Sequence, residues 1–188
     1  LINRSEFENR LIGALDAPRE NAEITHAPLY VDLDQFKVVN DTCGHDAGDE
    51  LLRQISALLK DKVRKRDTIA RLGGDEFGLL LERCSLKQAN RVAETVREAI
   101  DDFRFNWAGR NFRLGASIGV IPINYRSGNI ANVMRSADAA CYAAKESGKN
   151  RVITYAKDGE KCRRKYESSW ASLLNQALDQ DQFLLYAQ

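Results

Sequence analysis

The sequence predicts an α/β sandwich in which helices flank a central mixed β-sheet. Short apolar runs rich in β-branched residues alternate with longer segments whose apolar residues recur at helical spacing. Two of these runs, 68–71 and 79–81, stand on either side of a Gly-Gly step, so the sheet contains adjacent antiparallel strands. The 188 residues are enough for one sizeable domain plus an appendage.

Composition narrows the class of protein. Charged residues at 29% and hydrophobic residues at 44% are ordinary for a soluble globular protein, and a net charge of +1 offers no attraction to a nucleic acid. No apolar run approaches the ~18–20 residues that span a bilayer. We therefore expect a cytoplasmic domain without nucleic-acid or membrane contact, while an anchor upstream of Leu1 would lie outside this sequence. The cysteines lack a C-x-x-C pattern, which favours buried or incidental thiols over a zinc site: Cys43, Cys84, Cys141 and Cys162.

The first predicted element is a helix over residues 2–15, whose apolar side chains recur at helical spacing. Ser5 followed by Glu8 matches a capping box at the start of this helix. Residues 17–25 are polar and contain Pro18, so we expect a loop there.

Residues 27–34 are predicted to form a short buried strand that ends in two acids, Asp32 and Asp34. Ligands of open α/β sheets gather near the carboxyl ends of strands, which makes both acids candidate site residues. Asp34 is equally well placed to cap a helix over residues 35–40, and the pattern leaves that choice open. Glycines over residues 41–48 then interrupt the helical pattern.

A long amphipathic helix follows residue 48 and ends in a mostly basic cluster, 62–67, directly before the hairpin strands. Ser85 and Gln88 form a capping-box pattern that opens the next helix, whose apolar positions continue to Phe103. The remaining elements are a small hairpin over 105–113 and a central strand over 114–123. They are followed by a helix over about 129–147, terminated by Gly148, and a closing strand over 151–155.

The composition changes near the end of the chain, and we place a domain boundary between residues 156 and 157. Apolar residues in phase predict a helix over 166–178, and residues 183–186 resemble a strand. One helix and one strand cannot bury a core of their own, so this segment either opens a second domain or docks on the first.

The stretch Gly73-Gly74-Asp75-Glu76 is the most unusual in the chain. Glycine alone enters positive φ without steric cost, so the Gly-Gly step predicts a tight hairpin. Two adjacent carboxylates at such a turn suit an oxygen-ligated divalent cation or a phosphate-bearing substrate. Taken alone, the stretch is also consistent with a solvated hairpin tip.

Motifs in a consistent order make residues 1–155 resemble the GGDEF diguanylate cyclase family. The signature itself is Gly73–Phe77, and Leu1–Arg4 resembles the end of the family's opening D-x-L-T-G-L-x-N-R motif. The other elements are D-x-D-x-F-K-x-x-N-D, G-H-x-x-G-D, S-x-G and A-D-x-A-x-Y-x-A-K, matched at residues 32–41, 44–49, 117–119 and 137–145.

The resemblance implies the nucleotidyl cyclase or palm fold, with the GGDEF stretch on a β-hairpin, and the condensation of two GTP molecules into cyclic di-GMP and pyrophosphate. Each 3′-hydroxyl attacks the other nucleotide's α-phosphorus, which requires metal ions and in-line positioning. By resemblance two Mg²⁺ or Mn²⁺ ions occupy each active site, bound by the carboxylates of Asp32 and Asp75 and the carbonyl of Leu33. Glu76 would bind metal or assist deprotonation of the hydroxyl, and the resemblance leaves this open.

The resemblance also implies the substrate contacts. Asn40 and Asp49 correspond to a guanine-reading pair, and an aspartate acceptor matches the N1–H and exocyclic amine that distinguish guanine from adenine. Gly73 and Gly74 would let the backbone approach the phosphates. Three lysines correspond to triphosphate contacts: Lys37, Lys145 and Lys149. At the position of Lys149 the family often has arginine, so a bidentate contact with phosphate would be replaced here by a single positive charge. We expect His45 to brace its loop by hydrogen bonding rather than to act as a base.

An R-x-x-D pattern at Arg64 and Asp67 lies where the family has an inhibitory site for its own product. By resemblance Arg64 would grip phosphate and guanine faces, while Asp67 would pair with a guanine edge. The charged end of a helix is the alternative explanation of the same four residues. Arg91 or Arg97 in the following helix would complete the site, and the sequence does not choose between them.

Residues 157–188 resemble the entry to an EAL phosphodiesterase domain but stop before its catalytic motifs, so the chain resembles a fragment of a tandem GGDEF–EAL protein. Because one domain holds one GTP, a homodimer is expected for catalysis, with cyclic di-GMP as product and inhibitor. The alternative is a catalytically silent module that binds GTP or cyclic di-GMP and controls an adjacent EAL domain. Intact acids at Asp75 and Glu76 favour synthesis, and the guanine pair disfavours a palm-type polymerase or a cyclase of another substrate.

Overall fold

Five strands form one mixed sheet in the order β2-β3-β1-β6-β7. The computed structural model describes residues 1–155, and the tail segment 156–188, with its predicted helix and strand, lies outside the described part. The central strand β1 runs antiparallel to both neighbours, β3 is also antiparallel to β2, and β7 is parallel to β6. The strands span Ala27–Asp34 (β1), Thr68–Gly73 (β2), Glu76–Leu81 (β3), Gly115–Val120 (β6) and Arg151–Thr154 (β7). The predicted mixed sheet is confirmed.

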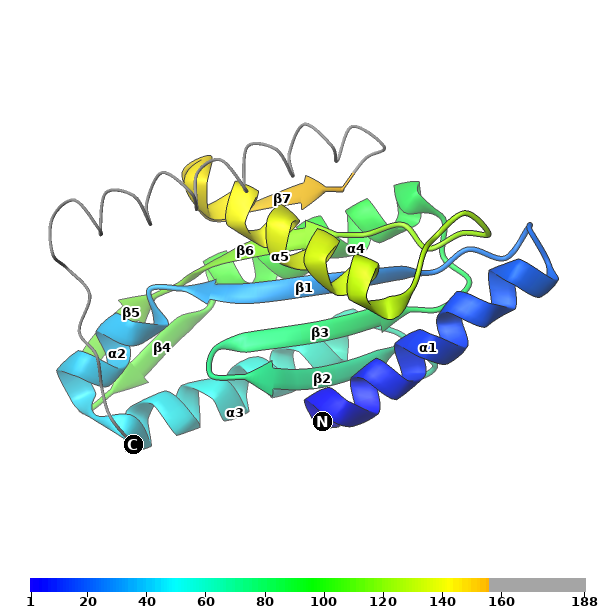
Figure 1. The fold of residues 1–188 in the computed structure, drawn as a ribbon. Helices are drawn as coiled ribbons and strands as arrows, with labels where there is room; N and C mark the ends of the chain where they lie inside the picture. The colour runs from blue at the N-terminus through cyan, green and yellow to red at the C-terminus, as the bar shows by residue number, and fades with distance from the viewer. Residues whose placement is uncertain (156–188) are drawn as a thin grey trace, which may run out of the picture.

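Helices cover both faces of the sheet and make a three-layer sandwich (Figure 1). One face is covered by α1 (Arg4–Glu20) and α5 (Ile130–Glu146), and the other by α3 (His45–Lys62) and α4 (Leu86–Asp102). The short helix α2 (Phe36–Cys43) follows directly on the carboxyl end of β1. A separate hairpin leads from α4 to β6 and consists of β4 (Arg104–Trp107) and β5 (Arg110–Arg113).

Strand β1 is buried along its whole length because each of its faces meets a different core. Leu29, Val31 and Leu33 pack into the core beneath α3 and α4, whereas Tyr30 packs into the core beneath α1 and α5. Since side chains alternate along a strand, Asp32 and Asp34 share the face of Tyr30. This alternation brings two buried carboxylates to the same edge of the domain, at the end of β1.

The predicted start and end of the first helix are both wrong. Asn3, not Ser5, caps α1, and the side chain of Asn3 accepts a hydrogen bond from the backbone N–H of Glu6. The helix continues to Glu20 and includes Pro18 in its last turn. Proline removes one intrahelical hydrogen bond there, but its ring is buried, and this burial offsets part of the loss.

Two further boundaries differ from the predicted ones. The break predicted over residues 41–48 shrinks to the single residue Gly44, whose φ of +85° lets α3 begin immediately after α2. Asp34 does not cap α2, because the N-cap position is Gln35 and has no side-chain hydrogen bond. By contrast, the predicted capping box of Ser85 and Gln88 at the start of α4 is confirmed.

Three of the four cysteines, Cys43, Cys84 and Cys141, lie in the described part and are free thiols, while Cys162 lies outside it. Between residues 1 and 155, every helix is too short or too polar to cross a lipid bilayer.

Candidate functional site

The GGDEF stretch forms the turn between β2 and β3, as predicted. Gly73 pairs with Glu76, so the two turn residues are Gly74 and Asp75 rather than the two glycines. Gly74 has a φ of +47°, a left-handed conformation that favours glycine. The Nε of Arg71 donates a hydrogen bond to the carbonyl oxygen of Gly74 at 3.1 Å, which fastens the turn to its own strand.

Three carboxylates meet beside this turn. Glu76 lies opposite Asp32 in the β1–β3 register, and directly opposed residues of paired strands project to the same face. The backbone N–H of Leu33 donates to the carbonyl oxygen of Asp75 at 3.3 Å, which ties the turn to the end of β1. Burial raises the pKa of Asp32 above its ordinary value, and the negative charges of Asp75 and Glu76 raise it further.

Lys145, in the last turn of α5, partly compensates this negative charge. Its Nζ lies 2.6 Å from Oδ2 of Asp32. Burial lowers the pKa of Lys145, but the hydrogen bond to Asp32 and the surrounding carboxylates outweigh this and raise it. The same hydrogen bond lowers the pKa of Asp32 without cancelling the effect of burial. Lys145 is thus the ion-pair partner of Asp32, whereas Asp75 and Glu76 make no ion pair with another residue of the described part.

This donor set fits a hard divalent cation. Mg²⁺ and Mn²⁺ prefer carboxylate and carbonyl oxygens, and the end of β1 and the turn supply both kinds through Asp32, Asp75, Glu76 and Leu33. Among residues 1–155 there is no close-set cage of three His, Cys, Asp or Glu side chains. Mg²⁺ usually retains several waters and takes further oxygens from substrate phosphates, so few protein carboxylates are needed to bind it.

The predicted guanine-reading pair lies where α2 meets α3. Asn40 is in α2, and its Oδ1 is buried without a hydrogen-bond partner in the described part of the chain. Its amide lies against Gly48, where a Cβ atom would come within 1.9 Å of this oxygen. An orphaned buried acceptor costs free energy until a donor reaches it, and the N–H groups of guanine are such donors.

Asp49 follows Gly48 on α3 and is exposed. It lines an open hollow of about 590 Å³ between α3 and the β4–β5 hairpin, together with Asp46, Glu50, Arg53, Gln54, Asn106 and Trp107. The structure thus brings Asn40 and Asp49 to either side of one glycine. Sequence reasoning missed Trp107, because nothing in its local pattern indicates that its hairpin lies beside α3.

The other predicted phosphate contacts are the lysines Lys37 and Lys149, both exposed. Lys37 lies in the first turn of α2, one residue after Phe36. Lys149 lies in the loop between α5 and β7 and has a φ of +60°. His45 is the first residue of α3 and is exposed, and its side chain makes no hydrogen bond with another described residue. The prediction that His45 braces a loop is therefore wrong.

Asp34 is the residue whose role the sequence left most open. Its Oδ1 accepts a hydrogen bond from Oγ of Ser117 at 2.9 Å, and its Oδ2 accepts one from the backbone N–H of Asn150 at 2.8 Å. Only 5% of the residue is exposed. Both oxygens are thus engaged by neutral donors from β6 and from the Lys149 loop.

Arg64 and Asp67 lie at the other end of β2, in the turn between α3 and that strand. Oδ2 of Asp67 accepts a hydrogen bond from the backbone N–H of Arg64 at 3.0 Å, and Oδ1 accepts one from the N–H of Glu82 at 3.3 Å. Arg64 itself is exposed. The six residues of β2 place this turn about 20 Å from the Gly74 turn, at ~3.3 Å per residue.

The two arginines proposed to complete that site differ in their contacts. Arg97 is held by Glu94, with Nε 2.7 Å from a carboxylate oxygen, and by Glu98 at 3.6 Å. Arg91 is exposed and lies nearer the amino end of α4, which begins shortly after the carboxyl end of β3.

Residues 1–151 match the protein-family model described as "Diguanylate cyclase, GGDEF domain". The chain belongs to this family. A relative named "Probable diguanylate cyclase DgcE", from Escherichia coli (strain K12), is 44% identical over 155 residues, which are 82% of this chain and 14% of DgcE. "Cyclic di-GMP phosphodiesterase PdeB" of Shewanella oneidensis is 33% identical over 190 aligned positions, which cover 100% of this chain and 22% of PdeB. The chain thus spans less than a quarter of either relative.

Solved GGDEF domains share the fold. A structure of PA1120 (TpbB or YfiN) from Pseudomonas aeruginosa, comprising only the GGDEF domain, has a TM-score of 0.80 and 31% identity, covering 87% of this chain and 95% of that one. The GGDEF domain of DgcB from Caulobacter crescentus, in complex with c-di-GMP, has a TM-score of 0.77 and 28% identity, covering 82% of this chain and 91% of that one. The fold observed here is that of GGDEF domains.

Proposed function

We propose that this domain condenses two molecules of GTP into cyclic di-GMP and pyrophosphate. The observation that carries the proposal is the placement of Asp75 and Glu76 near Asp32 beside a glycine turn, with Lys145 as the ion-pair partner of Asp32. These acids suit metal ions that hold a triphosphate, and the exposed lysines Lys37 and Lys149 suit its phosphate groups. Membership of the diguanylate cyclase GGDEF family supports the same reaction.

In this proposal each side chain has one task. Asp32, Asp75 and the carbonyl of Leu33 bind Mg²⁺ or Mn²⁺, and Glu76 either joins them or accepts the proton of the attacking 3′-hydroxyl. Two such ions, when bound, neutralise phosphate charge and acidify that hydroxyl. The triphosphate is bound by three lysines, Lys37, Lys145 and Lys149. The backbone at Gly73 and Gly74 lies close to the phosphates.

Base selection falls to α2 and α3. Asn40 offers a buried acceptor that has no partner in the described residues, and Asp49 offers a carboxylate on the far side of Gly48. Both accept hydrogen bonds from the N1–H and amino group of guanine. Adenine presents no such pair of donors on that edge, so ATP leaves the buried oxygen of Asn40 unpaired, at a cost of ~1–3 kcal/mol.

Two GTP molecules react with each other, and each domain supplies contacts for one of them. The proposal therefore includes a homodimer in which two half-sites face each other. It also includes product inhibition, with cyclic di-GMP bound at Arg64 and Asp67, about 20 Å from the catalytic turn. A guanidinium suits both phosphate and the face of a base.

A second candidate function is a regulatory module that binds GTP or cyclic di-GMP and controls an adjacent phosphodiesterase domain. The match to a protein named cyclic di-GMP phosphodiesterase, which covers the whole of this chain, favours it. Residues 157–188 resemble the beginning of an EAL domain, and they lie outside the described structure. On this reading the chain belongs to a tandem GGDEF–EAL protein.

One experiment separates the two candidates. The 188-residue chain is incubated with GTP and Mg²⁺ or Mn²⁺, both alone and fused to a parallel dimeric coiled coil, and cyclic di-GMP is measured by chromatography. Synthesis that depends on the coiled coil and does not occur with ATP supports the cyclase. Tight GTP binding without product in the forced dimer favours the regulatory module.

A further inference from the structure

The loop that carries Lys149 has an unusual backbone. Gly148, Lys149 and Asn150 have successive φ values of +114°, +60° and +45°, all in the left-handed region. A residue other than glycine or asparagine costs on the order of 1 kcal/mol in that region, so surrounding contacts must hold the loop. Backbone N–H groups of Gly148 and Lys149 donate to carbonyl oxygens at the end of α5, which anchors one side of it.

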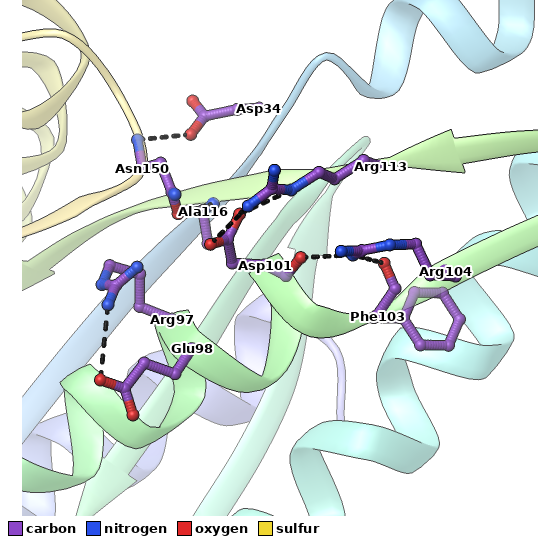
Figure 2. Close-up of polar contacts among 9 residues, drawn as sticks. All are labelled: Asp34, Arg97, Glu98, Asp101, Phe103, Arg104, Arg113, Ala116 and Asn150. Carbon is purple, nitrogen blue, oxygen red and sulfur yellow. Dashed lines mark hydrogen bonds and ion pairs between the residues drawn. The ribbon is translucent and has the colours of Figure 1, made fainter.

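The other side of the loop is anchored by Asp34. The backbone N–H of Asn150 donates to Oδ2 of Asp34 at 2.8 Å (Figure 2). Oγ of Ser117 donates to Oδ1 of the same carboxylate at 2.9 Å and fixes its orientation. Asp34 makes no ion pair with another described residue, so its charge is stabilised by these neutral donors.

The side chain of Asn150 extends the same network away from the loop. Its Oδ1 accepts a hydrogen bond from the N–H of Ala116 at 3.5 Å. Arg113 holds the carboxylate of Asp101 at 3.0 Å and lowers its pKa, and the side chain of Asn150 contributes a smaller lowering (Figure 2). A Cβ atom on Gly115 would lie 3.0 Å from both Oδ2 of Asp34 and Cβ of Asn150, so any larger residue would press on both.

We infer that Asp34 is a positioning residue, which fixes the Lys149 loop to β1 and thereby sets the distance between Lys149 and the carboxylate of Asp32. Asp32 and Asp34 are two residues apart on one face of a buried strand, about 6.6 Å along its axis. One acid faces the cluster at the turn, and the other anchors the loop opposite. This inference rests on the proposed function, in which Lys149 binds the triphosphate and Asp32 the metal.

The geometry also predicts which substitution Asp34 tolerates. The backbone N–H of Asn150 can only donate a hydrogen bond to the side chain at position 34. The hydroxyl of Ser117, in contrast, can rotate and accept a hydrogen bond instead of donating one. An asparagine can therefore keep both contacts, with its oxygen toward Asn150 and its amide toward Ser117. An alanine loses both and leaves the backbone N–H of Asn150 without its partner.

The test is a double-mutant cycle in which the full chain is titrated with Mg²⁺ and 3′-deoxy-GTP, which binds but lacks the attacking hydroxyl. Removing a charge-assisted phosphate contact in Lys149→Met should weaken binding about 10-fold. Asp34→Ala should weaken it several-fold alone and add little in the Lys149→Met background, because both changes remove the same contact. Asp34→Asn should bind nearly as well as the native chain.

A matched control separates positioning from stability. Asn129→Ala removes the N-cap of α5, whose Oδ1 accepts from the N–H of Asn132 at 3.0 Å, and lies at the opposite end of that helix from the Lys149 loop. It should lower the melting temperature and leave 3′-deoxy-GTP affinity unchanged. If Asp34→Ala does not fold, Ser117→Ala takes its place in the cycle, since it removes one donor and keeps the carboxylate.

The outcomes are distinguishable. Losses of affinity that multiply in the double variant, or an Asp34→Ala chain that binds 3′-deoxy-GTP as well as the native one, would overturn the positioning role. Poor binding by Asp34→Asn would also contradict it. A native chain that binds no guanine nucleotide would overturn both this inference and the proposed function.

Discussion

The β2–β3 hairpin carries acids at both of its ends, the Gly74 turn and the Asp67 turn, about 20 Å apart. At the Gly74 turn, the charges of Asp75 and Glu76 add to burial and raise the pKa of Asp32. At the other turn, each oxygen of Asp67 accepts a backbone hydrogen bond. At the Gly74 turn, carboxylates lie close to one another. At the other turn, the single carboxylate of Asp67 is hydrogen-bonded to the backbone.

This difference between the two turns indicates that the acids of the Gly74 turn serve ligand binding, whereas the backbone hydrogen bonds of Asp67 contribute to the stability of the fold. Like charges brought together oppose folding and favour a cation, so the acids of the Gly74 turn are suited to a ligand. A carboxylate that accepts main-chain hydrogen bonds stabilises the turn it closes. Substitutions at the two ends should therefore have opposite effects on activity and on stability.

The largest effect is expected for Asp75→Asn, which should reduce synthesis of cyclic di-GMP by at least ~100-fold, because it removes a metal ligand. The melting temperature should not fall, since one of three mutually repelling carboxylates is gone. Chromatographic assay and scanning calorimetry measure the two quantities. Asp102→Asn, an exposed acid at the end of α4, is the control for loss of one charge. A marked drop in melting temperature for Asp75→Asn would contradict the claim that the acids of the Gly74 turn oppose folding.

Gly74→Ala tests the conformation of the first turn. Its φ of +47° leaves alanine strained by about 1–2 kcal/mol, although no atom of residues 1–155 would lie within 4 Å of the added methyl. Gly109→Ala in the β4–β5 turn, with φ +77° and equally open space, is the matched control. Both should lose similar stability in urea denaturation, while only Gly74→Ala should also lose synthesis. Equal activity losses would show that strain, not the site, is responsible.

Asp67→Ala and Arg64→Ala separate structure from product binding at the second turn. Asp67→Ala leaves two backbone N–H groups without their acceptor and should cost ~1–3 kcal/mol of unfolding free energy. Arg64→Ala, an exposed side chain, should cost less than about 0.5 kcal/mol. Both should abolish inhibition by cyclic di-GMP in initial-rate assays. Product binding that survives both changes would eliminate this site.

The smallest effect is a pH dependence at the same end of the hairpin. His26 is 6% exposed, and its Nδ1 accepts from the backbone N–H of Arg83 at 3.3 Å. Burial lowers its pKa below 6.5; the charge of Glu82 raises it and that of Arg83 lowers it. The unfolded chain therefore binds the proton first, so stability is complete above pH 6.5 and falls as the pH drops below it.

This dependence is measured as the unfolding free energy between pH 7 and pH 5. His26→Gln should reduce the slope relative to the native chain, because it removes the titrating imidazole. An unaltered slope in His26→Gln would assign the acid sensitivity to other groups.

Local patterns predicted much of the fold. The capping box of Ser85 and Gln88 and the hairpin around Gly74 depend on residues within a few positions of each other, and both are present. Local pattern does not predict where the first helix starts, because Asn3 and Ser5 are both good N-cap residues. Asn3 is the observed N-cap, and the helix that follows it packs against β2. Local propensity places Pro18 in a loop, because it takes no account of the burial of the proline ring against the core.

Short, ordered motifs identify the family, the hairpin and the residue types at the candidate site without any knowledge of the fold. The contacts of the two acids of β1, in contrast, follow from long-range packing. Asp32 and Asp34 are equivalent in local pattern, but β3 brings Glu76 opposite one, and the loop after α5 brings Asn150 to the other. The physical reason is that the surroundings of a carboxylate are set by strand pairing and chain crossings, which lie up to 116 residues away in the sequence.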